Sequence, residues 1–196
     1  MPVVAIIPVK SFRSAKGRLA DALDTERRRR LSVALAGHVA TSAEAADVLP
    51  LVVTSDAEVA EWATSAGFPT LADPGLGLNA AAATGVDWAI RARSSWLVIH
   101  SDLPLLTPTD VEAVAKPLES GGTSLAPSTD GGTSAIGGHR PFDFAYGVSS
   151  FHRHLRRLPQ TSIVVRAGLA LDIDSPDDLR TAITASAGDW LRGAIH

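Results

Sequence analysis

Short apolar runs alternate with longer amphipathic stretches through the first two-thirds of the chain. Residues 3–9 (VVAIIPV) form a β-branched and nearly unbroken run, which is typical of a strand buried on both faces. Similar runs predict strands at 49–55, 69–73 and 95–102, and the stretches between them predict helices at about 25–46, 56–67, 79–94 and from Thr107 or Thr109 onward. This order predicts an α/β fold of three layers, α/β/α, in which a mostly parallel, Rossmann-like sheet lies between helices.

The rhythm changes after residue 120. Residues 121–150 are rich in Gly, Ser and Pro and contain two short apolar pieces, each long enough for a strand. Irregular stretches of this length in a compact domain are often binding loops. The remaining predicted elements are a helix at 149–158, a strand pair at 162–166 and 169–174, and a last helix from Asp177. No composition shift marks a boundary, so we interpret residues 1–196 as one domain.

The composition excludes several classes of chemistry. The chain has no Cys, which rules out disulfides, zinc–thiolate sites, iron–sulfur clusters and thiol nucleophiles. Its 18 Lys and Arg against 21 Asp and Glu give a formal charge of −3, whereas a nucleic-acid-binding protein normally carries a positive excess. The opening residues lack a basic segment ahead of the apolar run, and no stretch reaches the ~20 apolar residues of a membrane span. We therefore expect a cytoplasmic protein whose partners include neither nucleic acid nor membrane.

A basic loop follows the first predicted strand. Lys10, Arg13, Lys16 and Arg18 place four cations within nine residues. In open parallel sheets, ligands bind at the carboxyl ends of the strands, and the first strand-to-helix loop is the usual phosphate site. Cations there would pair with the oxygens of a triphosphate. The alternative is a solvated loop, which the position directly after the first strand disfavours.

Acidic residues end two of the predicted strands. Asp102 follows an apolar strand and precedes a stiff Leu-Pro turn, and one carboxylate at the sheet edge suits a hard cation such as Mg²⁺. A role for Asp102 as a helix cap is disfavoured because the next helix has caps of its own. Asp172 and Asp174 lie two apart in the strand predicted at 169–174, so they would share one face and could reach the same ion. His100, alone at a buried strand end, is more typical of a structural residue.

Glycine-rich segments give weaker signals. Residues 75–80 (GLGLNA) fit the G-x-G-x-x-A fingerprint, which would indicate a nicotinamide-dependent oxidoreductase. The strand before them is short, however, and this fingerprint normally follows the first strand. The turn at 130–134 and the segment 146–150, which leads into a helix, could hold an anion on backbone N–H groups and hydroxyls. The basic residues of 27–30 and 152–157 are more typical of solvated helix faces.

Five motifs occur in a fixed order along the chain. They are Ile7-Pro8-Val9-Lys10, Ala15-Lys16-Gly17-Arg18-Leu19, Leu78-Asn79-Ala80, Asp102-Leu103-Pro104-Leu105-Leu106, and the stretch from Leu171 to Leu179. Together they resemble the phosphoenolpyruvate/2-phospho-L-lactate guanylyltransferases of deazaflavin coenzyme F-420 biosynthesis, within the molybdopterin-guanylyltransferase-like nucleotidyltransferases. The resemblance runs from residue 3 to about residue 183. It implies a sheet of the nucleotide-diphosphosugar transferase type.

The resemblance also implies an activity. The protein would transfer GMP from GTP to the phosphate of phosphoenolpyruvate or 2-phospho-L-lactate and release pyrophosphate, with Mg²⁺ as cofactor. By the same match, the catalytic set would be Lys10, Lys16, Arg18 and Asp102. The cations would hold phosphates, with Lys10, Arg18, Asn79 and Asp102 forming the nucleotide site and Asn79 contacting the nucleoside. Asp102 would be the main metal ligand, with Asp174 or Asp172 completing the shell.

The match is less close at the acceptor end, over about residues 121–150. There the family's acid-binding positions correspond to Thr133, Gly147 and Ser150. Many members have Gly-Thr-Asn-Ala where this chain has GTSA at 132–135, and the Gly-Pro-Gly-Ser form of the acceptor loop is missing at Val148-Ser149. Ser128-Thr129-Asp130 likewise replaces a usual Asp-Arg pair. These departures leave the identity of the small phosphorylated acid open.

Three alternatives follow from this uncertainty about the acceptor and from the glycine fingerprint. The first is another nucleotidyltransferase of the same superfamily, such as a molybdopterin guanylyl- or cytidylyltransferase. The second is a non-catalytic relative that binds a nucleotide or a phospho-acid. The third is the oxidoreductase suggested by residues 75–80. The base preference stays open, and so does the oligomeric state, for which a homodimer is one arrangement.

Overall fold

The computed structural model describes residues 1–13 and 16–195. The strands are β1 Val3–Pro8, β2 Leu49–Thr54, β3 Thr70–Ala72, β4 Ser95–Ile99, β5 Ser124–Pro127, β6 Thr133–Gly138 and β7 Ser162–Ile163. The α-helices are α1 Thr25–Glu44, α2 Ala57–Ser65, α3 Leu78–Arg91, α4 Pro108–Glu119, α5 Ser150–Arg157, α6 Ala167–Ala170, α7 Pro176–Thr184 and α8 Leu191–Ile195, with 3₁₀ turns η1 Gly17–Leu19 and η2 Ser186–Gly188. None of the described helices is both long and apolar enough to span a membrane.

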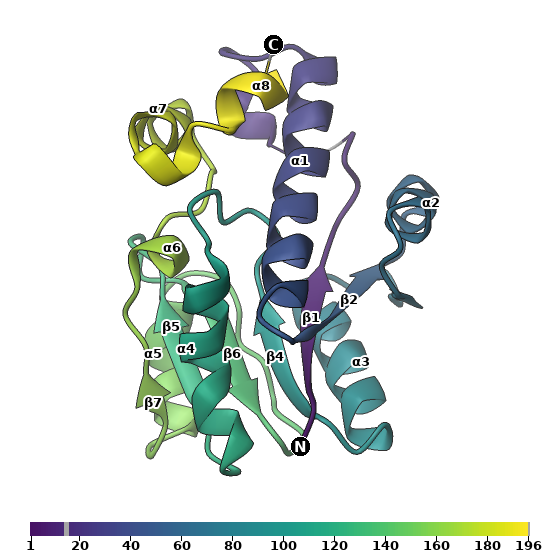
Figure 1. The fold of residues 1–196 in the computed structure, drawn as a ribbon, viewed down its shortest axis with the longest axis vertical. Helices are drawn as coiled ribbons and strands as arrows, with labels where there is room; N and C mark the ends of the chain where they lie inside the picture. The colour runs from purple at the N-terminus through teal and green to yellow at the C-terminus, as the bar shows by residue number, and fades with distance from the viewer. Residues whose placement is uncertain (14–15, 196) are drawn as a thin grey trace.

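The strands form one sheet in the order β3-β2-β1-β4-β6-β5-β7. The first four strands are parallel, β6 runs antiparallel to both of its neighbours, and β7 is parallel to β5. Helices α1 and α4 cover one face, while α3 and α5 cover the other (Figure 1). The predicted α/β/α fold with a mostly parallel sheet is therefore confirmed.

The central strand shows why this sequence forms three layers. Along β1, Val3, Ala5 and Ile7 pack into the core beneath α1 and α4, whereas Val4 and Ile6 pack into the core beneath α3. All five side chains are buried, and each fully buried Ile contributes about 1.5–3 kcal/mol by removal of apolar surface from water. Because β1 is buried on both faces, its side chains need not alternate between polar and apolar.

The prediction of a strand at 169–174 is wrong. The structure has the short helix α6 at Ala167–Ala170, followed by chain outside any helix or strand that crosses the carboxyl end of the sheet. The other member of the predicted pair shrinks to β7, which takes the edge of the sheet beside β5. With that edge occupied, the crossing segment is fixed instead by Thr129 N–H donating to Ala170 O at 2.8 Å and by Ile173 N–H donating to Asp102 O at 3.2 Å. These contacts place the acidic residues of the segment beside β4.

The helix after the crossing segment, α7, begins at Pro176, one residue before the predicted start at Asp177. Ser175 caps it, with Pro176 as the first helical residue. The Ser175 hydroxyl accepts from the backbone N–H of Asp178, and the Asp178 carboxylate accepts from the backbone N–H of Ser175. A third group of buried side chains joins α1, η1 and the C-terminal helices, including Leu19, Ile173 and Leu191. This cluster anchors η1 and the crossing segment, which flank the site described next.

Candidate active site

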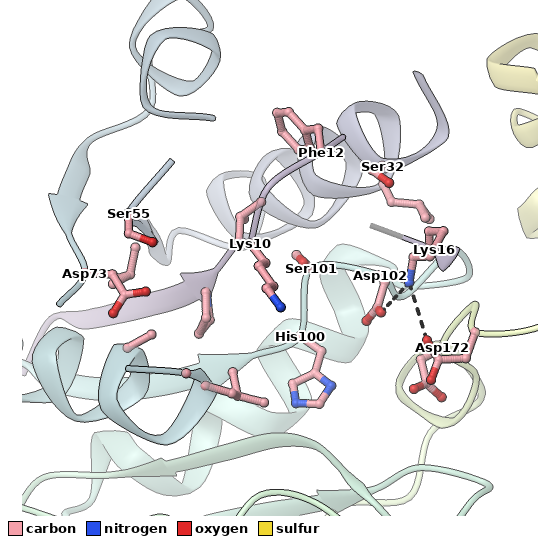
Figure 2. Close-up of a pocket in the computed structure, with 18 of the residues that line it drawn as sticks. Lys10, Phe12, Lys16, Ser32, Ser55, Asp73, His100, Ser101, Asp102 and Asp172 are labelled. Atoms are coloured by element: carbon pink, nitrogen blue, oxygen red, sulfur yellow. Dashed lines mark hydrogen bonds and ion pairs between the residues drawn. The ribbon is translucent and has the colours of Figure 1, made fainter. Parts of the chain in front are cut away.

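A cleft of about 550 Å³ opens at the carboxyl ends of β1, β2 and β4. Its polar lining comes from the loops that follow these strands, from the loop before α3 and from the crossing segment (Figure 2). The polar side chains that line it are Lys10, Lys16, Ser32, Ser55, Asp73, His100, Ser101, Asp102, Asp172 and Asp174. This is the edge of a parallel sheet at which ligands bind in open α/β folds.

Lys16 and Asp102 form the central ion pair of the cleft. Lys16 Nζ donates to Asp102 Oδ2 at 2.6 Å, and only 8% of the lysine side chain is exposed. Lys16 has a left-handed backbone (φ 57°) and precedes η1, whose Leu19 is fully buried and anchors the turn. Burial favours the neutral carboxyl of Asp102, but the Lys16 ammonium outweighs this effect and holds the pKa of Asp102 below its ordinary value. Asp102 is therefore a carboxylate at neutral pH.

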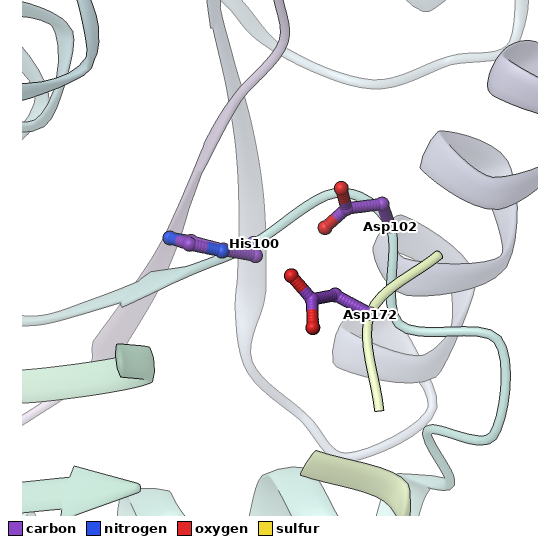
Figure 3. Close-up of side chains that lie close together, drawn as sticks. All are labelled: His100, Asp102 and Asp172. Carbon is purple, nitrogen blue, oxygen red and sulfur yellow. The ribbon is translucent and has the colours of Figure 1, made fainter. Parts of the chain in front are cut away.

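Asp172, which comes from the crossing segment, lies beside Asp102 and His100 (Figure 3). One atom each from His100, Asp102 and Asp172 lie within 4.8 Å of one another, close enough to hold a single metal ion. Burial, and then the negative charge of Asp102, raise the pKa of Asp172 to about 6. A divalent cation would relieve this repulsion, and paired carboxylates are ligands that Mg²⁺ prefers. The residues present therefore fit a divalent cation.

Asp174 takes a different position from the one its spacing suggested. Its carboxylate lies 3.8 Å from Lys16 Nζ and 3.6 Å from a guanidinium nitrogen of Arg18. It lines the cleft, but it is not in the cluster with Asp102 and Asp172. The predicted shared face required a strand, and without that strand the two acidic side chains contact different partners. Whether Asp174 reaches a metal stays a prediction.

The four cations of the basic loop divide into different environments. Lys10 points into the cleft (Figure 2), and no carboxylate in the described part of the chain pairs with it. Arg13 turns away, donating from Nε to Glu58 at 2.9 Å on α2. Arg18 is 80% exposed beside Asp174. Of the four, the structure thus directs Lys10 and Lys16 into the cleft.

The glycine-rich loop closes another side of the cleft. Gly75 and Gly77 have positive φ values of 75° and 94°, and α3 begins without a side-chain cap. Uncapped N–H groups at this helix start are donors suited to an anion. Asn79, in the first turn, accepts a bond from Tyr146 N–H at 2.9 Å through its side-chain oxygen. The loop follows β3 near the sheet edge, not β1, which disfavours the dinucleotide interpretation.

The three positions predicted to bind the acid lie together, but outside the open cleft. Thr133 and Ser150 are buried, 1% and 2% exposed, and the Ser150 hydroxyl donates to Thr133 Oγ1 at 3.3 Å. Gly147, with φ 112°, lies in the loop just before α5. The structure therefore places the two buried hydroxyls together and the exposed Gly147 beside them, where its carbonyl accepts from Ser150 N–H at 3.0 Å, while none of the three lines the cleft.

Comparisons with known proteins identify a family over nearly the whole chain. Residues 3–191 match the family described as "Guanylyl transferase CofC like". The chain belongs to this family. The phosphoenolpyruvate guanylyltransferases of Sphaerobacter thermophilus and Rubrobacter xylanophilus are 38% and 34% identical to it, over 91% and 96% of each chain. The 2-phospho-L-lactate guanylyltransferase of Methanothermobacter thermautotrophicus is 28% identical, over 98% of this chain and 89% of that one.

Solved structures place the same fold among nucleotidyltransferases. A Desulfovibrio desulfuricans G20 protein, provisionally named a nucleotide-diphospho-sugar transferase, superposes with a TM-score of 0.78 at 18% identity, covering 98% of this chain and 95% of that one. A nucleotidyl transferase from Methanothermobacter superposes with a TM-score of 0.62 at 14% identity, covering 98% of each chain. The predicted family and the predicted fold type of this guanylyl transferase are both confirmed.

Some residues of the guanylyl transferase site were not expected from the sequence. His100, interpreted as structural, lies in the acidic cluster, and burial lowers its pKa so that it stays neutral. Ser55 and Asp73 line the far part of the cleft (Figure 2), and their position at the ends of predicted strands was the signal available. The interpretation of 152–157 as a solvated helix face is wrong for His154, which is fully buried, whereas His152, Arg156 and Arg157 are exposed. His154 packs among the rings of a period-two aromatic segment, FDFAY at 142–146.

Proposed function

We propose that this chain transfers GMP from GTP to the phosphate of a small phosphorylated carboxylic acid, phosphoenolpyruvate or 2-phospho-L-lactate, and releases pyrophosphate. The observation that carries the proposal is the convergence of Lys16, Asp102 and Asp172 at one end of a cleft large enough for a nucleotide. Relatives named for both acceptors support the substrate class. We place the reaction in coenzyme F-420 biosynthesis and in the cytoplasm. A homodimer, if formed, would be seen by light scattering.

In this reaction an oxygen of the acceptor phosphate forms a bond to the α-phosphorus of GTP. The bond from that phosphorus to the bridging oxygen of the β-phosphate breaks, and pyrophosphate leaves with the electron pair. A phosphate nucleophile is already anionic at neutral pH, so the site needs no Ser or His base. The task of the protein is to position the two substrates and to offset their negative charge.

The residues of the cleft and those of the acceptor end would have separate tasks. Lys10 and Lys16 pair with phosphate oxygens, and Asn79, whose amide nitrogen has no partner among the described contacts, binds the nucleoside. Thr133, Gly147 and Ser150 bind the acid, and Arg18 pairs with phosphate from the open edge. A triphosphate next to two carboxylates is an arrangement of like charges, which a divalent cation would make favourable.

Asp102 and Asp172 would hold Mg²⁺, with His100 or Asp174 beside them. Bound there, the cation would neutralise charge on the phosphates and act as a Lewis acid. Asp102 would bind it through the oxygen that Lys16 leaves free, since Lys16 donates to Oδ2. Lys16 then keeps the carboxylate ionised and fixes its orientation.

The test is pyrophosphate release with each nucleoside triphosphate paired with each phospho-acid, in the presence of Mg²⁺. We expect release with GTP and phosphoenolpyruvate or 2-phospho-L-lactate, and a matching guanylylated acid by mass spectrometry. Release with GTP only when a molybdopterin is supplied would support the superfamily alternative. Binding of GTP without release in any combination would support the non-catalytic alternative and contradict the proposal.

A further inference from the structure

His154 on α5 is fully buried, and both of its ring nitrogens are bonded. Nδ1 lies 3.0 Å from Thr133 Oγ1, and Nε2 accepts from the backbone N–H of Ala145 at 2.9 Å. Because an amide N–H only donates, Nε2 must be unprotonated, and the ring proton is therefore on Nδ1 and donated to Thr133. Burial, with the cations of Arg157 and Arg153, lowers the pKa of His154 to about 4, in keeping with a neutral ring.

The next residue along the loop is held from the other side. Tyr146 N–H donates to the side chain of Asn79 in the first turn of α3, next to the glycine-rich loop of the cleft. Two successive amides, those of Ala145 and Tyr146, are thus fixed by α5 and by α3 respectively. The loop before α5 therefore bonds on one side to His154, which contacts the buried hydroxyl of Thr133. On the other side it bonds to the first turn of α3, beside the cleft proposed to bind the nucleotide.

We propose that His154 is a positioning residue, which holds the loop through Ala145 and orients the Thr133 hydroxyl so that the acid is aligned with the bound nucleotide. The proposal rests on the function proposed above and adds a residue to it. The rings of Phe142, Phe144 and Tyr146 surround the imidazole, with centroids 5.6, 6.2 and 5.0 Å away. In such surroundings a phenyl ring would pack as well, so the contribution specific to His154 is its pair of hydrogen bonds.

The kinetic test compares His154→Phe with His152→Phe, a matched substitution at an exposed position of the same helix. We expect His154→Phe to raise the KM for the acid about 10-fold, the scale of a lost buried hydrogen bond, with the Kd for GTP changed less than about 3-fold. His154→Gln, which can both donate and accept, should recover most of the loss. Equal kinetics in the two phenylalanine variants would overturn the proposal.

Two further measurements separate this proposal from the proposed function. Hydrogen exchange should show the amides of Ala145 and Tyr146 exchanging at least about 10-fold faster in His154→Phe than in His152→Phe. In the unmodified protein, nitrogen NMR should find an unprotonated Nε2 and a protonated Nδ1 at His154, a result that does not depend on whether the variant folds. The reverse tautomer, or unchanged exchange, would contradict the positioning role. A protein that releases no pyrophosphate in any combination would instead contradict the proposed function and leave these two results standing.

Discussion

The proposed nucleotide end, which is the open cleft, and the proposed acceptor end, around Thr133 and Ser150, expose their polar groups differently. At the nucleotide end, Lys10, Lys16 and Asp102 follow parallel strands and line an open cleft. At the acceptor end, Thr133 begins an antiparallel strand and its hydroxyl is buried against α5. Charged side chains directly after a parallel strand thus indicate an open cleft at the edge of the sheet. Hydroxyl side chains in a Gly- and Ser-rich segment indicate only that polar groups lie close together, whether buried or exposed.

The largest expected effect is at the centre of the nucleotide end. Asp102→Asn removes the carboxylate that pairs with Lys16 and faces Asp172, so turnover should fall on the order of 1,000-fold while the fold is kept. Asp189→Asn is the control, because that side chain is 73% exposed and lies outside the cleft, and it should lose far less. Single-turnover pyrophosphate release and circular dichroism measure both effects. Near-normal activity in the Asp102 variant would contradict the assignment of the metal site.

A smaller effect is expected at the phosphate loop. Lys10→Ala removes an ammonium that points into the cleft, so GTP should bind about 10–100-fold more weakly, the scale of a lost charge-assisted bond. The KM for the acid, measured at saturating GTP, should stay within about 3-fold. Calorimetric titration with a non-hydrolysable GTP analogue gives the first value. Equal weakening for nucleotide and acid would mean that the two ends are not separate.

The acceptor end should show the opposite selectivity. Thr133→Val keeps the shape of the side chain and removes its hydroxyl, so the KM for the acid should rise about 5–10-fold with little change in GTP affinity. Steady-state kinetics with each substrate varied in turn provides the measurement. A loss of thermal stability with unchanged KM would show that the buried hydroxyl serves packing alone.

The acidic cluster gives the metal-free protein a pH dependence. Since the pKa of Asp172 is raised to about 6, the folded state holds a proton that the unfolded chain releases near pH 4, and stability falls as the pH rises through this window. The expected loss is on the order of 1 kcal/mol, because solvent screens a partly exposed carboxyl. Asp172→Asn should remove this fall in the free energy of unfolding, measured by urea titration with EDTA present at pH 4.5 and at pH 7.5. The same pH dependence in both proteins would show that the fold does not raise the pKa of Asp172.

The comparison also shows how far the sequence alone could predict the molecule. The apolar run of β1 and the position of Asp102 after β4 are local features, and the structure places both as expected. The segment 169–174 alternates like a strand, yet its backbone bonds to Thr129 and Asp102, which lie in loops, and it joins no strand of the sheet. His154 looked solvated because its helix is rich in cations, and only the aromatic loop folded over it makes it buried. Both errors arise from contacts outside the helix or strand itself, which its own periodicity does not encode.

The smallest effect is expected at Arg13. Substituting this residue tests whether a cation contacts the phosphates because it lies in the basic loop or because its side chain points into the cleft. Arg13 lies in the same basic loop as Lys10, but its guanidinium is 78% exposed and bonded to Glu58 on α2. Arg13→Ala should therefore change GTP affinity less than about 2-fold, since an exposed ion pair contributes at most about 1 kcal/mol and this one lies outside the cleft. The same calorimetric titration, compared with Lys10→Ala, decides the point. A loss as large as that of Lys10→Ala would mean that the loop rearranges around the triphosphate and that Glu58 releases Arg13 when the nucleotide binds.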